Sequence, residues 1–338
     1  MPAAAIVADL DRIFFVVGRG RSGTTLLSRM LTRNPALEVA PEGFFVMNLV
    51  RTYGAGAWSP TRVDAFCRDL VGENRMRTWQ LDLSDIRKRL LAALPDLTFA
   101  RACTEVYVSY AEVTAGRSGI VRVGDKNPHY GLFADRLIEL FPRARFVHIV
   151  RDPRDNVLSY QGVPFDLAEP AALAYRWARY NGELLAVASR HPGSFHRVHY
   201  EQLIEQPEAT LSGVCEFLGV PFSQAMLKFF EHAPKSFYGE GSAWFEKLGT
   251  PLDRAQAHKW DGAMPPEVVR LVEEVAHDMM ERLGYRRTRR PMRLPPAARF
   301  QVGVGWASVE AERAIFGVLP AAPRIWFINT YRSRSGRV

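Results

Sequence analysis

The fold of this chain is decided by residues 13–27, which read IFFVVGRGRSGTTLL. Five apolar residues rich in valine and phenylalanine predict a buried strand. The glycines that follow allow a tight loop and close approach of a ligand. Thr24 and Thr25 then open an amphipathic helix, which the Asn-Pro pair at 34–35 ends. Because the first turn of a helix has free N–H groups and carries the positive end of the helix dipole, an anion is expected to bind there.

The glycine loop fits two different motifs. Gly18 and Gly23 have the spacing of a P-loop, but Thr24 stands where a P-loop NTPase has its phosphate-binding lysine, which argues against nucleotide hydrolysis. With Gly20 the same letters fit a dinucleotide fingerprint, and Glu38 stands about where a ribose-binding acid would fall. We favour a terminal phosphate or sulfate, because an arginine, a serine and two threonines surround Gly23. A glycine turn without a ligand is the remaining alternative.

Composition bounds the class of protein. With 338 residues, of which 47% are hydrophobic, the chain can bury a large core. Its three cysteines, Cys67, Cys103 and Cys215, are far apart and odd in number, which favours neither a disulfide framework nor a metal site. The first twelve residues lack the pattern of a signal peptide, and no window approaches the length of a membrane span. These features predict a cytosolic protein.

Apolar runs alternate with amphipathic segments along the rest of the chain. Strands are expected at 37–40, 120–123, 145–150 and 194–199, and helices at about 44–94 with breaks, 97–115, 129–141, 170–190, 207–218 and 265–283. This alternation implies right-handed crossovers and a parallel sheet covered on both faces. We therefore predict a P-loop-like, three-layer α/β/α domain over residues 1–285, and a basic, aromatic C-terminal extension over 286–338.

A second group of charged residues follows the apolar run 145–150. Arg151 stands at the end of that expected strand, while Asp152 and Pro153 suit the N-cap and first position of a helix. Ser159 lies about two turns into this helix. A guanidinium fork with a hydroxyl suits a second anion. The alternative is a surface ion pair between Arg151 and a nearby aspartate, Asp152 or Asp155, beside a solvent-facing serine.

Together these stretches resemble the sulfotransferases that use PAPS, 3′-phosphoadenosine 5′-phosphosulfate. The resemblance is carried by RGRSGTTLL (19–27), by Phe146 through RDPR (151–154) to Ser159, and by YEQL (200–203) with PE (207–208) and FLG (217–219). It covers about residues 12–220. It is nearest to the tyrosylprotein and bacterial carbohydrate sulfotransferases, because the cytosolic aryl enzymes have lysine where this chain has Arg21.

The resemblance implies two anion sites for one donor, with the 5′-phosphosulfate on the first loop and the 3′-phosphate on the second. The implied donor-binding residues are Arg19, Gly20, Arg21, Ser22, Gly23, Thr24, Thr25, Arg151, Ser159 and Tyr200. Tyr200 would contact the adenosine, although a half-buried core tyrosine is nearly as good an interpretation. Residues 235–259 are expected to form a loop over the site.

Three residues are candidates for catalysis. Sulfuryl transfer needs in-line geometry and cations near the leaving oxygens. By resemblance, Glu42 after the second strand would take the acceptor's proton, with Glu38 as its competitor and an exposed turn glutamate as the other interpretation. Lys126 would neutralise the bridging oxygen, unless it is a surface lysine paired with Asp125. Arg21 would share that electrostatic task, and no metal is expected.

The C-terminal extension holds the chain's excess of positive charge. From Arg286 onward there are eleven arginines against Glu310 and Glu312, so this segment carries net +9 and the first 285 residues carry −1 of the total of +8. One hypothesis is a surface for anionic lipid at the inner membrane face or for an acidic substrate. We favour packing on the catalytic domain or on a second subunit, because no clean amphipathic period is present.

The sequence thus predicts transfer of a sulfuryl group from PAPS to the hydroxyl of a carbohydrate, glycolipid, peptide tyrosine or small metabolite, with PAP as product and no nucleic-acid partner. Two rivals stay open. A nicotinamide-dependent oxidoreductase would use Glu38 for the ribose and would have no need of Arg151 with Ser159. A non-catalytic nucleotide-binding protein would keep both loops and lack a working base.

Overall fold

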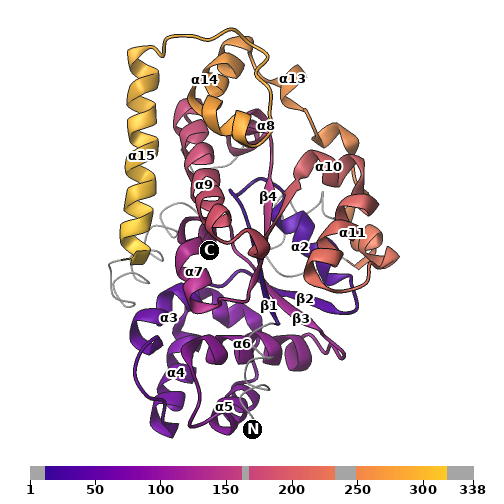
Figure 1. Ribbon diagram of the computed structural model, residues 1–338, viewed down its shortest axis with the longest axis vertical. Helices are drawn as coiled ribbons and strands as arrows, with labels where there is room; N and C mark the ends of the chain where they lie inside the picture. Colours follow the sequence, from indigo (N-terminus) through magenta and orange to yellow (C-terminus); the bar gives the residue numbers. More distant parts are fainter. Residues whose placement is uncertain (1–11, 162–166, 233–248, 318–338) are drawn as a thin grey trace.

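The computed structural model describes residues 12–161, 167–232 and 249–317, and there it shows the predicted α/β fold (Figure 1). One parallel sheet has the strand order β2-β3-β1-β4-β5. Its strands are β1 (Ile13–Val17), β2 (Leu37–Ala40), β3 (Arg122–Lys126), β4 (Arg145–Val150) and β5 (Phe195–His199). Because β1 lies in the middle, the loop that follows it opens at the centre of the sheet's carboxyl edge.

Alternate side chains of β1 enter two different apolar cores. On one face, Phe15 packs against Phe141 and Phe146, with ring centroids 5.5 Å and 5.3 Å away. On the other face, Phe14 and Val16 pack under α2 (Thr24–Thr32) and α11 (Pro207–Leu218). Each such phenylalanine contributes about 1.5–3 kcal/mol when it is fully buried. The strand with the glycine loop is therefore held rigidly from both sides.

The helices form the two outer layers of the three-layer architecture. Those contributing to the Phe15 side include α3 (Phe45–Tyr53), α4 (Pro60–Gly72), α5 (Leu83–Ala92), α6 (Phe99–Ser109), α7 (Ala134–Leu140) and α9 (Pro170–Arg190). The other side is covered by α2 (Thr24–Thr32), α10 (Tyr200–Glu205) and α11 (Pro207–Leu218). A third apolar cluster joins α9 to α8 (Pro153–Gln161), α13 (Trp260–Ala263) and α14 (Pro266–Arg282).

The third strand of the chain differs from its prediction. We expected a strand at 120–123 and a loop over 124–128, whereas β3 continues to Lys126 and pairs with β1 as far as Val16. Gly124 suggested a loop, but the ring of Phe14 lies over it, so that an added Cβ would be 2.4 Å from that ring. Asp125 and Lys126 suggested one too, because charged residues are rare in central strands.

Two predicted helices are also shorter than expected. The segment predicted at 97–115 is α6 followed by a π-helical turn over Tyr110–Thr114. The segment predicted at 129–141 begins with a 3₁₀ turn over Pro128–Phe133 and becomes α7 only at Ala134. Pro128 stands at the first position of that turn, and Asn127 caps it by accepting a hydrogen bond from the His129 N–H (3.1 Å).

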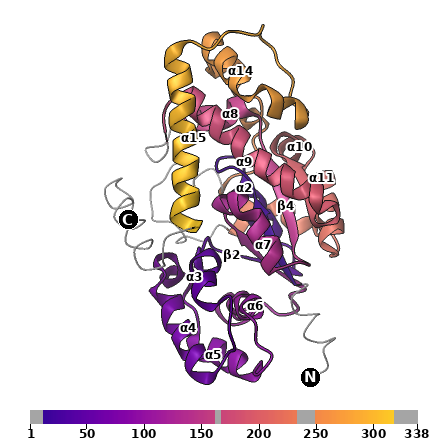
Figure 2. The same ribbon diagram turned by 60° about the vertical axis from the view of Figure 1, so that its left-hand side comes forward.

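A long helix, α15 (Pro296–Gly317), is the described part of the basic extension, and it lies along α9 in both ribbon views (Figures 1 and 2). Gly305 permits the close approach, because a Cβ there would be 2.8 Å from the Ala172 carbonyl oxygen. Ion pairs flank this contact, and one joins Arg313 to Glu183 (2.7 Å). The division of the chain at residue 285 stays a prediction, and residues 318–338 lie outside the described part.

Candidate functional site

The glycine loop turns directly into the N-terminus of α2. Gly23 has a φ of +95°, a conformation that favours glycine, and the ring of Tyr200 would lie 2.4 Å from a Cβ at this position. Arg21 also has a positive φ, of 65°. Such a conformation costs a non-glycine residue about 1–2 kcal/mol. This geometry places the first-turn N–H groups of α2 at the carboxyl edge of the sheet, as expected for an anion site.

Helix α8 fixes the loop from the side. The Asn156 amide donates to the Gly20 carbonyl oxygen (2.9 Å) and to the Ser22 hydroxyl (3.1 Å). Ser22 and Thr24 are buried, and Arg19 is buried over the aromatic faces of Tyr160 (4.2 Å) and Tyr180 (4.9 Å). Arg19 is thus built into the loop as a packed cation.

The predicted second cation site adjoins the first. Arg21 Nε donates to Ser159 Oγ (3.1 Å), and Arg151 donates to the Arg21 carbonyl oxygen (3.3 Å). Burial lowers the pKa of Arg21, and the positive charge of Arg151 adds to this effect. Two guanidiniums and a hydroxyl therefore converge where a phosphate would offset their repulsion. The surface interpretation of Arg151 is wrong, because its side chain is buried.

Three further neighbours hold the Arg151 guanidinium. It lies over the ring of Tyr200 (4.3 Å), donates to the Gln256 carbonyl oxygen (2.7 Å) and has Asp155 at 3.8 Å. Tyr200 begins α10 and is buried, so its interpretation as a core tyrosine stays open beside that of an adenosine contact. Its ring links Gly23 in the first loop to Arg151 in the second. Of the predicted loop over the site, residues 249–259 are described and supply Gln256.

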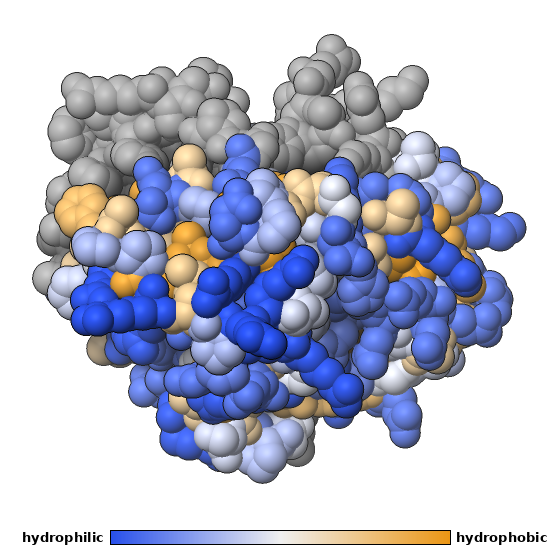
Figure 3. Space-filling view, turned by 90° about the horizontal axis from the view of Figure 1, so that it is seen from above, coloured by the Kyte–Doolittle hydropathy of each residue, from blue (hydrophilic) through white to orange (hydrophobic). Residues whose placement is uncertain are grey.

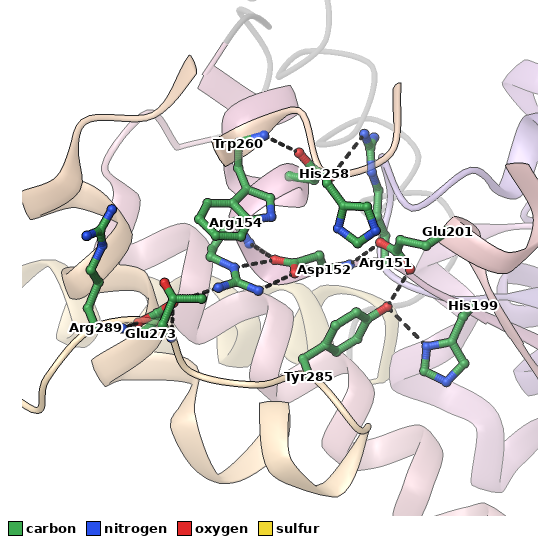
Figure 4. A network of polar contacts seen from close by, with 12 residues as sticks. Arg151, Asp152, Arg154, His199, Glu201, His258, Trp260, Glu273, Tyr285 and Arg289 are labelled. Carbon is green, nitrogen blue, oxygen red and sulfur yellow. Dashed lines mark hydrogen bonds and ion pairs between the residues drawn. The ribbon is translucent and has the colours of Figure 1, made fainter. Parts of the chain in front are cut away.

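Arg154, three residues after Arg151, has a different role (Figure 4). Its guanidinium forms buried ion pairs with Asp152 (2.6 Å) and Glu273 (2.6 Å) and lies over the Trp260 ring at 3.7 Å. The Asp152 N–H donates to Glu201 (2.9 Å), which in turn accepts from the Tyr285 hydroxyl (2.9 Å). This network braces the turn that carries Arg151, and Arg154 is turned into it.

The predicted catalytic pair lies at the carboxyl ends of β2 and β3. Lys126, only 3% exposed, forms an ion pair with Glu42 and donates to Thr25 Oγ1 (3.3 Å). Arg75, from the helical region after α4, pairs with the other Glu42 oxygen. The structure thus joins the base candidate to the glycine loop through one lysine. Lys126 is not the surface lysine paired with Asp125 that we weighed as an alternative.

The charge on Glu42 follows from these contacts. Burial alone would raise its pKa, but attraction by Lys126 and Arg75 and their hydrogen bonds outweigh burial and hold the pKa well below its ordinary value. Glu42 is therefore a carboxylate at neutral pH. It is also a weak base for as long as both cations remain beside it.

Asp125 lies beneath this pair and is buried. It accepts a hydrogen bond from the Tyr107 hydroxyl. Burial raises the pKa of Asp125 to about 8, against the effect of Tyr107, and the negative charge of Glu42 adds to the rise. The Asp125 carboxyl therefore holds its proton at neutral pH, so that Lys126 has one carboxylate partner in this group, Glu42.

Asp125→Asn is expected to make the protein more stable above pH 7. An unfolded aspartate has a pKa of about 3.9, so the unfolded state loses this proton first and wild-type stability falls as pH rises from about 4 to 8. The amide still accepts from Tyr107 and carries no charge. The measured quantity is the melting temperature of the variant minus that of the wild type. This difference should be larger at pH 8 than at pH 5 by at least about 2 °C. Parallel melting curves across this range would contradict the prediction.

Glu38, the acid required by the dinucleotide alternative, lies elsewhere. It is the second residue of β2 and is buried near Arg117 (3.8 Å). Arg117 also donates to the Thr32 carbonyl oxygen (3.1 Å), at the opposite end of α2 from the glycine loop. Burial raises the pKa of Glu38 to about 7. A ribose bound at the loop is thus out of its reach.

Three side chains that shape the site were not predicted from the sequence, namely Asn156, Tyr160 and Arg75. Helical periodicity could have indicated the first, because Asn156 lies one turn before Ser159 on α8. Tyr160 is one turn beyond Asn156 by the same period. For Arg75 no local signal exists, because its approach to Glu42 depends on how the α3 to α6 region folds over the sheet.

Comparison with known proteins gives the family. Residues 14–224 match the model of the family described as Sulfotransferase family, and the chain therefore belongs to the sulfotransferase family of enzymes. It is 26% identical over 286 residues to Protein-tyrosine sulfotransferase of Drosophila melanogaster, an alignment that covers 81% of this chain and 51% of that protein. It is 26% identical over 307 residues to Nodulation protein NoeE of Sinorhizobium fredii, covering 82% and 67%.

The fold agrees with that membership. The sulfotransferase domain from the curacin biosynthetic pathway superposes with a TM-score of 0.54 at 23% identity, covering 81% of this chain and 97% of that domain. The chain spans about half the length of the Drosophila relative. Family membership excludes the hypothesis of a nicotinamide-dependent oxidoreductase. The position of Glu38, far from the glycine loop, argues against that hypothesis as well. Across the described ranges, no helix is long and apolar enough to cross a membrane.

Proposed function

We propose that this enzyme transfers a sulfuryl group from PAPS to an acceptor hydroxyl. The observation that carries the proposal is the pairing of two cation sites. The N-terminus of α2 with Arg21 suits the 5′-phosphosulfate, and Arg151 with Ser159 suits the 3′-phosphate. A donor with a single phosphate group would leave one of them without an anion. Tyr200, which contacts both, is suited to stack against the adenosine.

In this proposal Glu42 and Lys126 divide the chemistry between them. Lys126 Nζ neutralises the bridging oxygen as the bond to sulfur breaks, and Arg21 assists from the loop. When Lys126 turns to the donor, Glu42 loses one of the two cations that depress its pKa, and it becomes a better base for the acceptor's proton. The nucleotide phosphate is already a good leaving group, so the chain's own side chains suffice and the proposal includes no metal.

The acceptor would enter on the side of α3 to α6. Glu42 lies between the sheet and this helical region, and Arg75 comes from it. Relatives of this chain are named protein-tyrosine sulfotransferases, which supports a hydroxyl acceptor on a peptide. Carbohydrate, glycolipid and small-metabolite acceptors stay open. A screen with labelled PAPS against tyrosine peptides, oligosaccharides and small phenols would decide among these classes.

Calorimetric titration with PAP tests the donor assignment directly. The purified enzyme should bind PAP with micromolar affinity and without added metal, while ATP and NAD bind far more weakly because neither supplies both terminal anions. Binding of NAD without binding of PAP would contradict the proposal.

Membrane contact through the extension stays a proposal. Six exposed arginines, at 282, 286, 289, 290, 293 and 299, lie on or near the segment between α14 and α15, beside Phe300, which is 74% exposed. Figure 3 looks onto this end of the molecule, where hydrophilic residues gather around a few apolar ones. Each arginine near an anionic surface contributes about 1 kcal/mol. If the membrane hypothesis holds, the enzyme cosediments with phosphatidylserine vesicles and not with neutral vesicles; equal sedimentation with both would contradict it.

A further inference from the structure

The helix α15 lies beyond the residues that match the family, yet one of its side chains reaches the edge of the proposed site. The Glu312 carboxylate accepts hydrogen bonds from the Tyr180 hydroxyl (2.7 Å) and from Arg176 (3.1 Å), and it pairs with His129 Nδ1. Burial alone would raise the pKa of Glu312, but His129, Arg176 and Tyr180 outweigh burial and hold the pKa well below its ordinary range. Glu312 is therefore a charged, nearly buried carboxylate with partners on two different elements.

The His129 partner leads to the acceptor side of the site. His129 belongs to the 3₁₀ turn that directly follows β3 and Lys126, and its ring lies 5.4 Å from that of Phe44. The same segment holds the neighbouring turn, because Asn127 and the Tyr130 hydroxyl both donate to the Gly43 carbonyl oxygen at 3.0 Å. Gly43 is the residue after Glu42. The segment gripped by Glu312 is thus the one that positions the proposed base.

The Tyr180 partner leads to the donor side. Its hydroxyl points to Glu312, while the face of its ring contacts the guanidinium of Arg19 at 4.9 Å. Arg19 belongs to the glycine loop. One carboxylate on α15 therefore touches two residues whose other contacts are the base-bearing turn and the phosphosulfate loop.

The packing of α15 against the rest of the protein fixes the position of the Glu312 carboxylate. Val309, one turn before Glu312, is completely buried against Leu132 and Tyr180. Ser308 accepts from Arg176 at 2.5 Å. With Gly305 against Ala172, these contacts fix both the rotation and the height of the helix on α9. Glu310, two residues earlier, is half-exposed, and its ion-pair contact with the described residues is a distant one with Arg179 (3.7 Å).

We propose that Glu312 is a positioning residue that couples the C-terminal helix to both halves of the active site, holding His129 for the turn at 41–44 and Tyr180 for Arg19. This proposal rests on the proposed function, which gives the turn at 41–44 its catalytic role and Arg19 its role in donor binding. Its structural core, a link from α15 to the turn at 41–44, can be measured without a substrate. The C-terminal segment is then a working part of the catalytic domain.

Hydrogen exchange of the full chain tests the link. In Glu312→Gln, which keeps the shape of the side chain and removes its charge, amides at 41–48 and 127–133 should exchange roughly tenfold faster, and PAP should bind roughly threefold to tenfold more weakly. The matched control Glu310→Gln should change neither. A role in helix docking alone would instead raise exchange only in α15 and the facing part of α9.

Unchanged exchange at 41–48 together with unchanged PAP affinity, in a Glu312→Gln protein whose α15 stays protected, would overturn the proposal. If α15 itself loses protection in that variant, Tyr180→Phe decides, because it removes one hydrogen bond to Glu312 and keeps the ring on Arg19. Weaker PAP binding in Tyr180→Phe supports the link and unchanged binding overturns it. If the wild type fails to bind PAP, the proposed donor is wrong, and the exchange at 41–48 judges the link by itself.

Discussion

Replacing Glu42 with glutamine is expected to lower turnover by about 10²- to 10⁴-fold, the range that a general base supplies. The amide keeps the size of the side chain and cannot accept the acceptor's proton. Affinity for PAP should change by less than about threefold, because Glu42 does not belong to either cation site and contacts the loop only through Lys126 and Thr25. Turnover with labelled PAPS and calorimetry with PAP measure the two effects separately.

Glu38→Gln is the matched control for this experiment. It makes the same chemical change four residues earlier, at a buried acid that contacts Arg117 near the far end of α2. Its turnover should stay close to that of the wild type. If Glu42→Gln turned over as fast as the wild type, the assignment of Glu42 as the base would be wrong. An absence of transfer in the wild type with every acceptor class tested would favour the non-catalytic alternative.

The central part of the fold could be predicted from the sequence because its signals are local. The strands at 13–17, 37–40 and 145–150 have the predicted boundaries, since short, mostly apolar runs mark buried parallel strands. The helix after Asp152 begins as expected, with the Asp152 side chain accepting from the Arg154 N–H (2.9 Å). The loop and Arg151 were found for the same reason, because each lies directly after such a strand.

The contacts that complete the site could not be predicted, because they join distant parts of the chain. His129 and Glu312 are 183 positions apart, and Arg75 meets Glu42 across 33 positions. No periodicity or capping rule relates such pairs, and their geometry depends on helix packing. The prediction of where β3 ends failed for a different reason. Asp125 and Lys126 are ionisable residues, and the partners Tyr107 and Glu42 help to make their burial tolerable.

Arg151 and Arg154 are only three positions apart in the chain, but their replacement by alanine is expected to change different quantities, PAP affinity for Arg151 and fold stability for Arg154. Arg151→Ala should weaken PAP binding by roughly 10- to 100-fold, the effect of losing one charged hydrogen-bonding partner, with little change in thermal stability. Its guanidinium lies beside Arg21 and over Tyr200, and its contacts within the protein are a few hydrogen bonds and one long ion pair with Asp155. Arg151→Lys should recover only part of the affinity, because an ammonium cannot form the two-pronged contact with a phosphate.

Arg154→Ala should instead destabilise the fold by about 3–5 kcal/mol, because it leaves Asp152 and Glu273 buried without their cation. Molecules that remain folded should still bind PAP, since this guanidinium points into the network of Figure 4, where its partners are Asp152, Glu273 and the Trp260 ring. Thermal unfolding and calorimetry, performed on both variants at one temperature where each is folded, separate the two losses. If Arg154→Ala lost PAP affinity while keeping its melting temperature, the roles of the two arginines would be reversed, and the second anion site would have to be moved to the α14 side of the turn.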